Sequence, residues 1–187
     1  AIDVLVRLQI ATRQDFDETF CWDSARYDQE LMIMRESEYF RKAFCRDYLG
    51  FTDLDHGLAE EFTSLAGRAG QESAEYILHR DYQSRNLMIC QGRLRVIDYQ
   101  GARFGPLGYD LASLLNDSYA VLPEEIRQEL VDYYLDEVNK YISLDRRLFV
   151  DGYYYLSIQR NLQVLGAFAF LSQKRKKIFF KQWKSFS

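Results

Sequence analysis

Apolar residues recur at intervals of three and four along most of the chain, which is the period of an amphipathic helix. This pattern predicts helices over residues 2–10, 27–48, 58–69, 109–119, 123–141 and 152–171. Gly50 follows the second of these and is suited to ending it, because glycine readily adopts the left-handed conformation of a helix cap. Pro123 suits the first turn of the fifth. The residues predicted to share one face are Ile2, Leu5, Val6 and Gln9 on the first helix, Ile126, Leu130, Tyr134, Val138 and Tyr141 on the fifth, and Tyr155, Ile158, Leu162, Leu165 and Ala169 on the sixth. The chain is therefore expected to be mainly α-helical.

The pattern changes between the third and fourth predicted helices. Residues 87–90 and 94–97 are short apolar runs, and the pair Gln91-Gly92 between them is typical of a tight β-hairpin turn. A Gly-rich loop follows the second run. We expect a mainly α (α+β) fold in which one small hairpin is inserted at the surface of a helical body.

Composition narrows the classes of function. The chain has 187 residues, 48% of them hydrophobic, which suits the core of one domain or one large lobe. A formal net charge of −4 predicts no general affinity for nucleic acid. The three cysteines form no CxxC pair, so neither a disulfide framework nor a zinc site is expected. Together with the lack of any apolar run of membrane-spanning length, this favours a cytoplasmic protein without a membrane partner.

The C-terminal segment, residues 172–187, is rich in lysine and arginine and holds no acidic residue. One interpretation is a solvated helix that packs against the otherwise acidic chain. Another is a basic lid near a phosphate or an anionic substrate.

The order of polar side chains within residues 78–106 matches the needs of phosphoryl transfer. That reaction requires positioned metal ions, neutralised phosphate charge and a carboxylate that accepts the proton of the attacking hydroxyl. Asp81 is a candidate for the catalytic base. Asn86 ends the same loop, and the predicted hairpin brings Asp98 back beside it, so the two are expected to hold Mg²⁺ through oxygen ligands.

Other interpretations of these residues are structural. The aspartates could serve as turn and cap residues, and His79 is expected to hold the loop by hydrogen bonding. Arg80 and Arg85 either reach a phosphate or lie on the surface in solvent.

Two stretches resemble the catalytic region of the aminoglycoside phosphotransferase and choline kinase superfamily, which shares the protein-kinase fold. "HRDYQSRN" matches its H-x-D-x-x-x-x-N loop, and "IDYQ" matches its metal motif. The resemblance implies ATP and Mg²⁺ as cofactors, Asp81 as base, and Asn86 and Asp98 as metal ligands. "GPLGYDLASLL" is similar to the helix that follows, whose aspartate, Asp110 here, supports the catalytic loop together with His79 and Arg80.

A protein kinase is the obvious alternative, and three departures count against it. The metal motif is Asp-Tyr-Gln rather than Asp-Phe-Gly. Gln83 stands where protein kinases usually place a phosphate-binding lysine. The Asp110 helix precedes residues 122–124, "LPE", whereas the corresponding helix of protein kinases follows their Ala-Pro-Glu motif. A small-molecule kinase is favoured, with Gln83 and Arg85 as candidates for contacts to the nucleotide.

Within the superfamily, "VIDYQGARFGPLGYDLASLLNDSY" and "QRNLQVLGAFAFL" resemble the bacterial kinases that phosphorylate the anomeric hydroxyl of N-acetylmuramate and N-acetylglucosamine. The resemblance implies a sugar kinase whose partners are ATP and a small hydroxyl acceptor. Glu36, Tyr39 and Arg160 are candidates for contacts to the acceptor. Kinases of choline, homoserine or an aminoglycoside remain alternatives, because the same three catalytic residues serve them.

In this fold ATP lies between an N-terminal β-lobe and a helical C-terminal lobe. No G-x-G-x-x-G loop and no strand lysine followed by a helical glutamate occur in the sequence. Residues 1–187 are therefore expected to be the helical catalytic lobe, with the β-lobe absent from this chain and the chain inactive alone. A kinase-derived binding module that does no chemistry is the alternative from another class.

Overall fold

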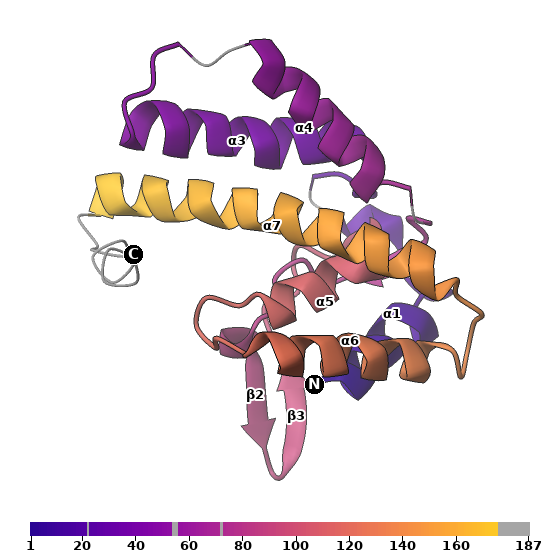
Figure 1. The fold of residues 1–187 in the computed structure, drawn as a ribbon. Helices are drawn as coiled ribbons and strands as arrows, with labels where there is room; N and C mark the ends of the chain where they lie inside the picture. The colour runs from indigo at the N-terminus through magenta and orange to yellow at the C-terminus, as the bar shows by residue number, and fades with distance from the viewer. Residues whose placement is uncertain (22, 54–55, 72, 176–187) are drawn as a thin grey trace.

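The computed structural model describes residues 1–21, 23–53, 56–71 and 73–175. Figure 1 shows a body of helices from which one β-hairpin projects. The helices are α1 (Ile2–Ala11), α2 (Gln29–Leu31), α3 (Glu38–Phe40), α4 (His56–Ala69), α5 (Gly108–Leu115), α6 (Glu124–Val138) and α7 (Arg146–Arg175), with the 3₁₀ turns η1 (Glu18–Phe20) and η4 (Ser84–Asn86) and the π-helical segments η2 (Met32–Ser37) and η3 (Arg41–Tyr48). The predicted mainly helical fold is confirmed.

Residues 29–48 form one continuous helix, in which the π-helical segments η2 and η3 alternate with the short α-helices α2 and α3. It begins where the Asp28 side chain accepts a hydrogen bond from Leu31 N at 2.9 Å. Phe40 stacks on Phe44, and Phe44 on Tyr48, with ring centroids 5.2 and 6.0 Å apart. Because these rings recur every four residues, they lie on one side of the helix.

The strands form two small antiparallel pairs. β2 (Leu87–Cys90) pairs with β3 (Arg93–Val96), and the turn residues Gln91 and Gly92 have φ values of 52° and 70°, as a two-residue hairpin of type I′ requires. The predicted hairpin is confirmed. β1 (Tyr76–Leu78) pairs with β4 (Arg103–Gly105), a strand that lies where the sequence analysis placed only a Gly-rich loop.

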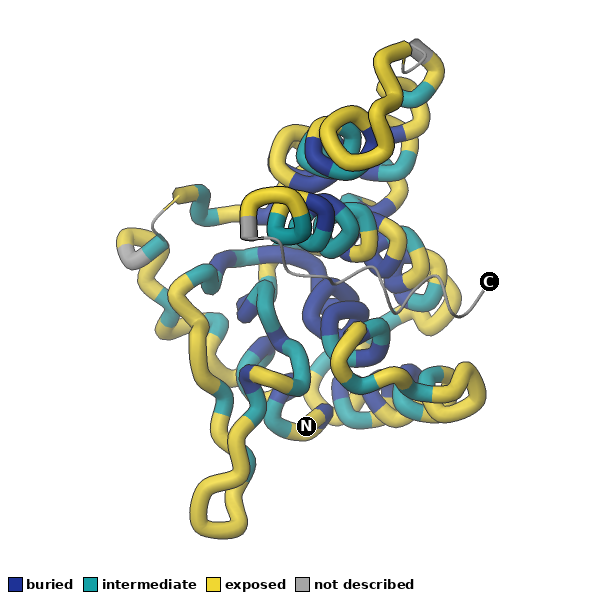
Figure 2. The backbone as a smooth tube through the Cα atoms, turned by 90° about the vertical axis from the view of Figure 1, so that its left-hand side faces the viewer, coloured by how far each residue is buried: buried dark blue, intermediate teal, exposed yellow. Residues whose placement is uncertain are grey.

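The core has two clusters. One joins α1, α5, α6 and the start of α7, and the other joins the 29–48 helix, α4, β1 and the middle of α7. Figure 2 shows these buried segments through the centre, whereas the hairpin is exposed. On α1 the predicted apolar face is correct, since Ile2, Leu5, Val6 and Gln9 are all buried.

The predicted inward faces of the last two helices were partly wrong. On α6 the buried residues are Val131, Tyr134, Leu135 and Val138, whereas Ile126 is exposed. On α7, Leu156 is buried and Ile158 is 48% exposed. The reason is that α7 contacts α5 on one side and the 29–48 helix on another, so its contacts do not follow one stripe.

Three further points concern the described part of the chain. No helix there is both long and apolar enough to cross a membrane. All three cysteines, Cys21, Cys45 and Cys90, are free thiols. Most of the basic C-terminal segment, from residue 176 onward, lies outside the described residues.

Candidate active site

The loop that carries Asp81 runs from β1 through η4 to β2, and a buried carboxylate holds its start. Arg80 has a φ of 74°, a left-handed conformation that non-glycine residues rarely adopt. The backbone N–H groups of His79 and Arg80 donate to the two oxygens of Asp110, at 2.6 and 2.9 Å. Asp110 has no exposed surface and lies in the first turn of α5. It therefore fixes the two residues that precede Asp81.

Burial determines the protonation states of Asp110 and His79, which hold the loop. It raises the pKa of Asp110 to about 7, although the two N–H donors oppose that rise. It lowers the pKa of His79, so the ring is neutral near pH 7 and Nε2–H donates to the carbonyl of Ile97 at 3.0 Å. Since Ile97 directly precedes Asp98, His79 connects the loop to the end of the hairpin.

Asp81 lies at the wall of a hollow of about 260 Å³ between the loop, α5 and α7. Its side chain is 50% exposed. Oδ1 accepts hydrogen bonds from Arg160 Nη2 at 3.1 Å and from Gln83 Nε2 at 3.3 Å. Both contacts are made to Oδ1, and no hydrogen bond to Oδ2 is found among the described residues.

Arg160 projects from α7 to Asp81, although it was predicted only as a contact to the acceptor. Its side chain is 6% exposed, and Nε donates to Ser113 Oγ at 2.9 Å. Burial alone would lower its pKa, but the attraction of Tyr109, Asp81 and Glu36 raises it above the ordinary value. The guanidinium is therefore a fixed positive charge beside Asp81.

Glu36 lies inside the protein rather than in the hollow. Its carboxylate accepts hydrogen bonds from the hydroxyls of Tyr27 and Tyr109 at 2.6 and 2.9 Å, and it has no exposed surface. Burial raises its pKa. The sequence-based expectation of a direct contact to the acceptor does not fit this position, because both oxygens are used by buried tyrosines. Glu36 instead supports Tyr109, whose ring lies 6.0 Å from the Arg160 guanidinium.

Tyr39, the remaining acceptor candidate, is half-buried and lies in a different hollow from Asp81. That hollow also includes Gln163 of α7, which lines the Asp81 hollow as well. The structure therefore brings Arg160 to Asp81 and places Tyr39 in the neighbouring hollow, with Gln163 lining both.

Asn86 and Asp98 are brought together by the hairpin. Ile97 N donates to the carbonyl of Asn86 at 3.1 Å, so Asp98 directly follows the residue bonded to Asn86. Asn86 Nδ2 donates to the backbone oxygen of Asp81 at 2.8 Å, which identifies Oδ1 as the atom that can bind a cation. Asp98 is exposed and adopts a φ of 70°.

This donor set fits Mg²⁺, which takes oxygen ligands and completes its shell with water and phosphates. In the described residues no group of three or more His, Cys, Asp or Glu side chains could hold a metal by itself. A site made of one amide and one carboxylate therefore depends on phosphate oxygens for the rest of its ligands. Metal binding by Asn86 and Asp98 stays a prediction.

The two residues predicted to contact the nucleotide, Gln83 and Arg85, also line the Asp81 hollow. Gln83 hydrogen-bonds the base, as described above. Arg85 is exposed, with its guanidinium 5.5 Å from the centroid of the Tyr119 ring. Arg80 instead lies near Gly101, where a Cβ on residue 101 would be in ordinary van der Waals contact with the Arg80 side chain, at 3.7–3.9 Å.

Asp117 is a structural residue of this site that the sequence analysis missed. It is 6% exposed and follows α5. Its Oδ2 accepts from Ser84 N at 2.7 Å and from Ser84 Oγ at 2.6 Å, while Oδ1 accepts from Tyr119 N at 2.9 Å. It thereby anchors the turn between Asp81 and Asn86. The only signal in the sequence is an Asp-Ser pair after a helix, which is common in turns.

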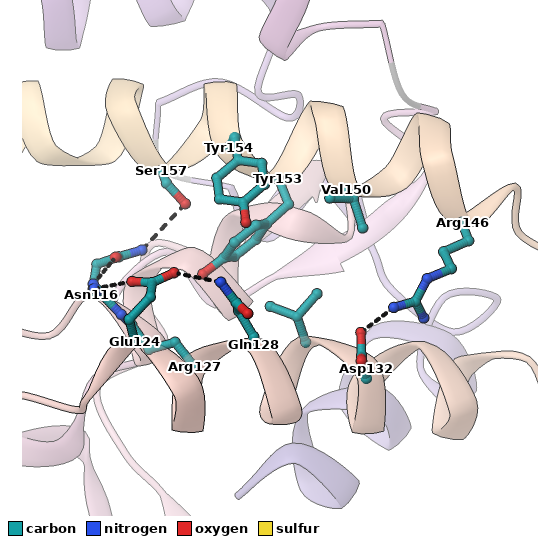
Figure 3. A pocket seen from close by; sticks show the side chains of 11 residues that line it. Asn116, Glu124, Arg127, Gln128, Asp132, Arg146, Val150, Tyr153, Tyr154 and Ser157 are labelled. Atoms are coloured by element: carbon teal, nitrogen blue, oxygen red, sulfur yellow. Dashed lines mark hydrogen bonds and ion pairs between the residues drawn. The ribbon is translucent and has the colours of Figure 1, made fainter.

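A second polar hollow, of about 420 Å³, lies between α6 and α7 (Figure 3). Its polar side chains mostly bond one another: Asn116 Nδ2 to Ser157 Oγ at 3.2 Å, Arg127 to Asn116 Oδ1 at 3.1 Å, and Arg146 to Asp132. None of the predicted catalytic residues lines it. The hollow at Asp81 is therefore kept as the candidate active site.

Comparison with known proteins identifies the family of the chain. Residues 1–146 match the phosphotransferase enzyme family. The chain is 32% identical over 184 residues to the N-acetylmuramate/N-acetylglucosamine kinase of Neisseria meningitidis, covering 90% of this chain and 50% of that protein. It is 30% identical over 148 residues to the protein of the same name from Pseudomonas aeruginosa, covering 76% of this chain and 44% of that one. A methylthioribose kinase of Erwinia tasmaniensis is 35% identical over 72 residues, covering 37% and 18%.

The chain spans about half the length of the curated relatives that it matches over most of its own length. Because the family match covers most of the chain and includes the loop of Asp81, the hairpin and Asp110, the chain belongs to the phosphotransferase enzyme family.

Proposed function

We propose that the full-length protein transfers the γ-phosphoryl group of Mg-ATP to a hydroxyl of a small amino sugar of the N-acetylmuramate or N-acetylglucosamine type. The observation that carries the proposal is the placement of Asp81. Its carboxylate reaches a solvent-open hollow from a loop that Asp110 and Asp117 fix at both ends. A positioned carboxylate is what the attacking hydroxyl needs in this reaction.

Each of the candidate site residues has a separate role in this proposal. Asp81 Oδ2 accepts the proton of the attacking hydroxyl, and Arg160 holds Oδ1 in place by a hydrogen bond. Asn86 and Asp98 would hold Mg²⁺, which would neutralise phosphate charge. Catalysis in this scheme is positioning and electrostatic stabilisation, because phosphoryl transfer needs no covalent step by the protein.

The choice of acceptor is supported by the names of the relatives that match most of the chain, in four bacterial species. A second candidate acceptor is another sugar, such as methylthioribose, since two methylthioribose kinases match a shorter stretch. A non-catalytic binding module is disfavoured, because it has no chemical need for Asp81, Asn86 and Asp98 together. We further propose that the protein acts in the cytoplasm, where ATP and Mg²⁺ are supplied.

A substrate panel tests the proposal. ADP release by the full-length protein is measured with Mg-ATP and N-acetylmuramate, N-acetylglucosamine, methylthioribose, choline or an aminoglycoside. We expect turnover with the two N-acetylated sugars and little with the others. Turnover with methylthioribose alone would favour the second candidate, and no turnover by a folded protein with any acceptor would contradict a kinase of this class.

A further inference from the structure

A basic groove lies beside the Asp81 hollow and has no role in the function derived so far. It has a volume of about 460 Å³ and runs along the 29–48 helix, which lies next to α7 in Figure 1. Its cations are Arg35, Arg41, Lys42 and Arg46, and we call these four residues the basic groove. Glu38 is the one acidic residue among those that line it. This excess of positive charge is notable in a chain of net charge −4.

The cations of the groove are available to a ligand. Three of them form ion pairs with carboxylates at the rim: Arg35 with Asp23 at 3.2 Å, Arg41 with Glu38 at 2.7 Å, and Arg46 with Asp47 at 2.8 Å. These pairs are largely exposed, and exposed pairs contribute little because water and salt screen them. A ligand anion can therefore replace such a partner at small cost.

Lys42 is the most available of the four. It is exposed, and no ion pair of Lys42 with another described residue is found. A lysine in this position has three donors on a flexible stem and can turn toward an anion in the groove.

The groove adjoins the base. Gln163 lines both the groove and the Asp81 hollow. Arg160 is hydrogen-bonded to Gln163 on one side and to Asp81 on the other. Residues 160 and 163 are three apart on α7, which is about 4.5 Å along a helix axis. A molecule of the size of a substituted monosaccharide can therefore extend from Asp81 past Gln163 into the groove.

We propose that the basic groove binds a carboxylate of the acceptor while the hydroxyl to be phosphorylated lies at Asp81. This inference rests on the proposed function and adds a basis for specificity to it. N-acetylmuramate differs from N-acetylglucosamine by a lactyl ether that ends in a carboxylate. The groove offers cations to that group, and it offers nothing comparable to the neutral sugar.

The test is direct binding, which does not depend on turnover. Isothermal titration of the full-length protein with N-acetylmuramate and with N-acetylglucosamine, both without ATP, is compared with the Lys42→Gln variant and the Arg41→Gln/Lys42→Gln double variant. We expect the double variant to bind N-acetylmuramate about tenfold more weakly, as loss of charge-assisted hydrogen bonds implies. Binding of N-acetylglucosamine should change less than about twofold.

Salt provides a second readout. Binding of N-acetylmuramate to the unaltered protein should weaken between low and high NaCl, because screening reduces the attraction of exposed charges. The double variant should lose most of this dependence. Arg93→Gln is the matched control for Lys42→Gln, since each removes one positive charge and Arg93 lies on the exposed hairpin, which projects away from the 29–48 helix in Figure 1.

The titrations also separate the acceptor carboxylate from phosphate as the source of the anion. Titration with Mg-ATP alone should give the same affinity for the double variant and the unaltered protein. A loss of Mg-ATP affinity would overturn the assignment, because the groove would then bind nucleotide phosphates. Equal losses for both sugars, or no loss for N-acetylmuramate, would overturn it as well.

Failure of the proposed function is distinguishable from failure of the groove. If neither sugar causes ADP release but N-acetylmuramate binding still depends on Lys42 and Arg41, the kinase proposal fails and the carboxylate site stands. Lys42→Gln alone guards against a folding defect, because the side chain is exposed and substitutions at exposed positions change stability little.

Discussion

Asp117→Ala tests whether the turn between Asp81 and Asn86 is held as the structure shows. The Asp117 carboxylate accepts three hydrogen bonds, two from Ser84 at 2.7 and 2.6 Å and one from Tyr119 N at 2.9 Å. Alanine leaves two backbone N–H groups without this acceptor. A hydrogen bond to a charged group contributes about 1.5–3 kcal/mol, and a helix-capping side chain contributes about 0.5–2 kcal/mol.

Because water can reach part of this turn, we take the lower values and expect a loss of about 2–4 kcal/mol in the free energy of unfolding. Urea unfolding of the full-length protein measures the loss, and hydrogen exchange at the Ser84 amide locates it. Asp151→Ala is the matched control, since Asp151 is exposed on α7. A Ser84→Ala/Asp117→Ala double-mutant cycle isolates the side-chain bond, with a coupling of about 1 kcal/mol.

Two results would refute this reasoning. One is a change in stability below about 0.5 kcal/mol, the range of ordinary surface substitutions. The other is unchanged exchange at the Ser84 amide together with a loss of stability, which would place the effect elsewhere in the protein.

Four further predictions concern the support, packing, charge and metal of the site. Burial raises the pKa of Asp110 from an ordinary 3.8 to about 7, so between these pH values the folded state binds more protons than the unfolded state. The free energy of unfolding should therefore fall as the pH rises from 4 to 7. Urea titrations at several pH values measure this fall, and the Asp110→Asn variant should lose the part that is due to Asp110. Gly105→Ala should cost about 1–3 kcal/mol in thermal unfolding, because its Cβ would lie 2.3 Å from Leu78 Cδ1; an unchanged melting temperature would contradict the packing. Arg160→Lys keeps the charge but loses the guanidinium contacts to Ser113 and Asp81, so kcat should fall about tenfold. Circular dichroism should show that the variant keeps its fold. An unchanged kcat would mean that Arg160 has no role in the site. Chelation of divalent ions should abolish ADP release, which added Mg²⁺ should restore, and activity that persists in chelator would contradict the metal assignment.

What the sequence could predict was local. The spacing from His79 to Asn86 and the Gln91-Gly92 turn specify the catalytic loop and the hairpin, because each depends on residues that are close in the chain. The apolar face of α1 was also correct, since one stripe packs on one side.

What the sequence could not predict depends on contacts between distant segments. Arg160 reaches Asp81 across 79 positions, and Asp117 reaches Ser84 across 33. Neither contact can be predicted from the periodic pattern of apolar residues in the sequence. Buried polar residues add to the difficulty, because Glu36 and Arg160 count as polar positions in the pattern but occupy the interior. Strand β4 was missed for a similar reason. It is a strand because it pairs with β1, and its glycine-rich sequence alone does not indicate a strand.

The central claim is that Asp81 is the base of a phosphoryl transfer, and turnover by the Asp81→Asn variant tests it most directly. Asparagine keeps the size and the exposed position of the side chain but cannot accept the proton. With saturating Mg-ATP and N-acetylated sugar, we predict that kcat of the full-length protein falls at least about 100-fold, while its melting temperature and sugar affinity change little. A variant that keeps its turnover would contradict the account.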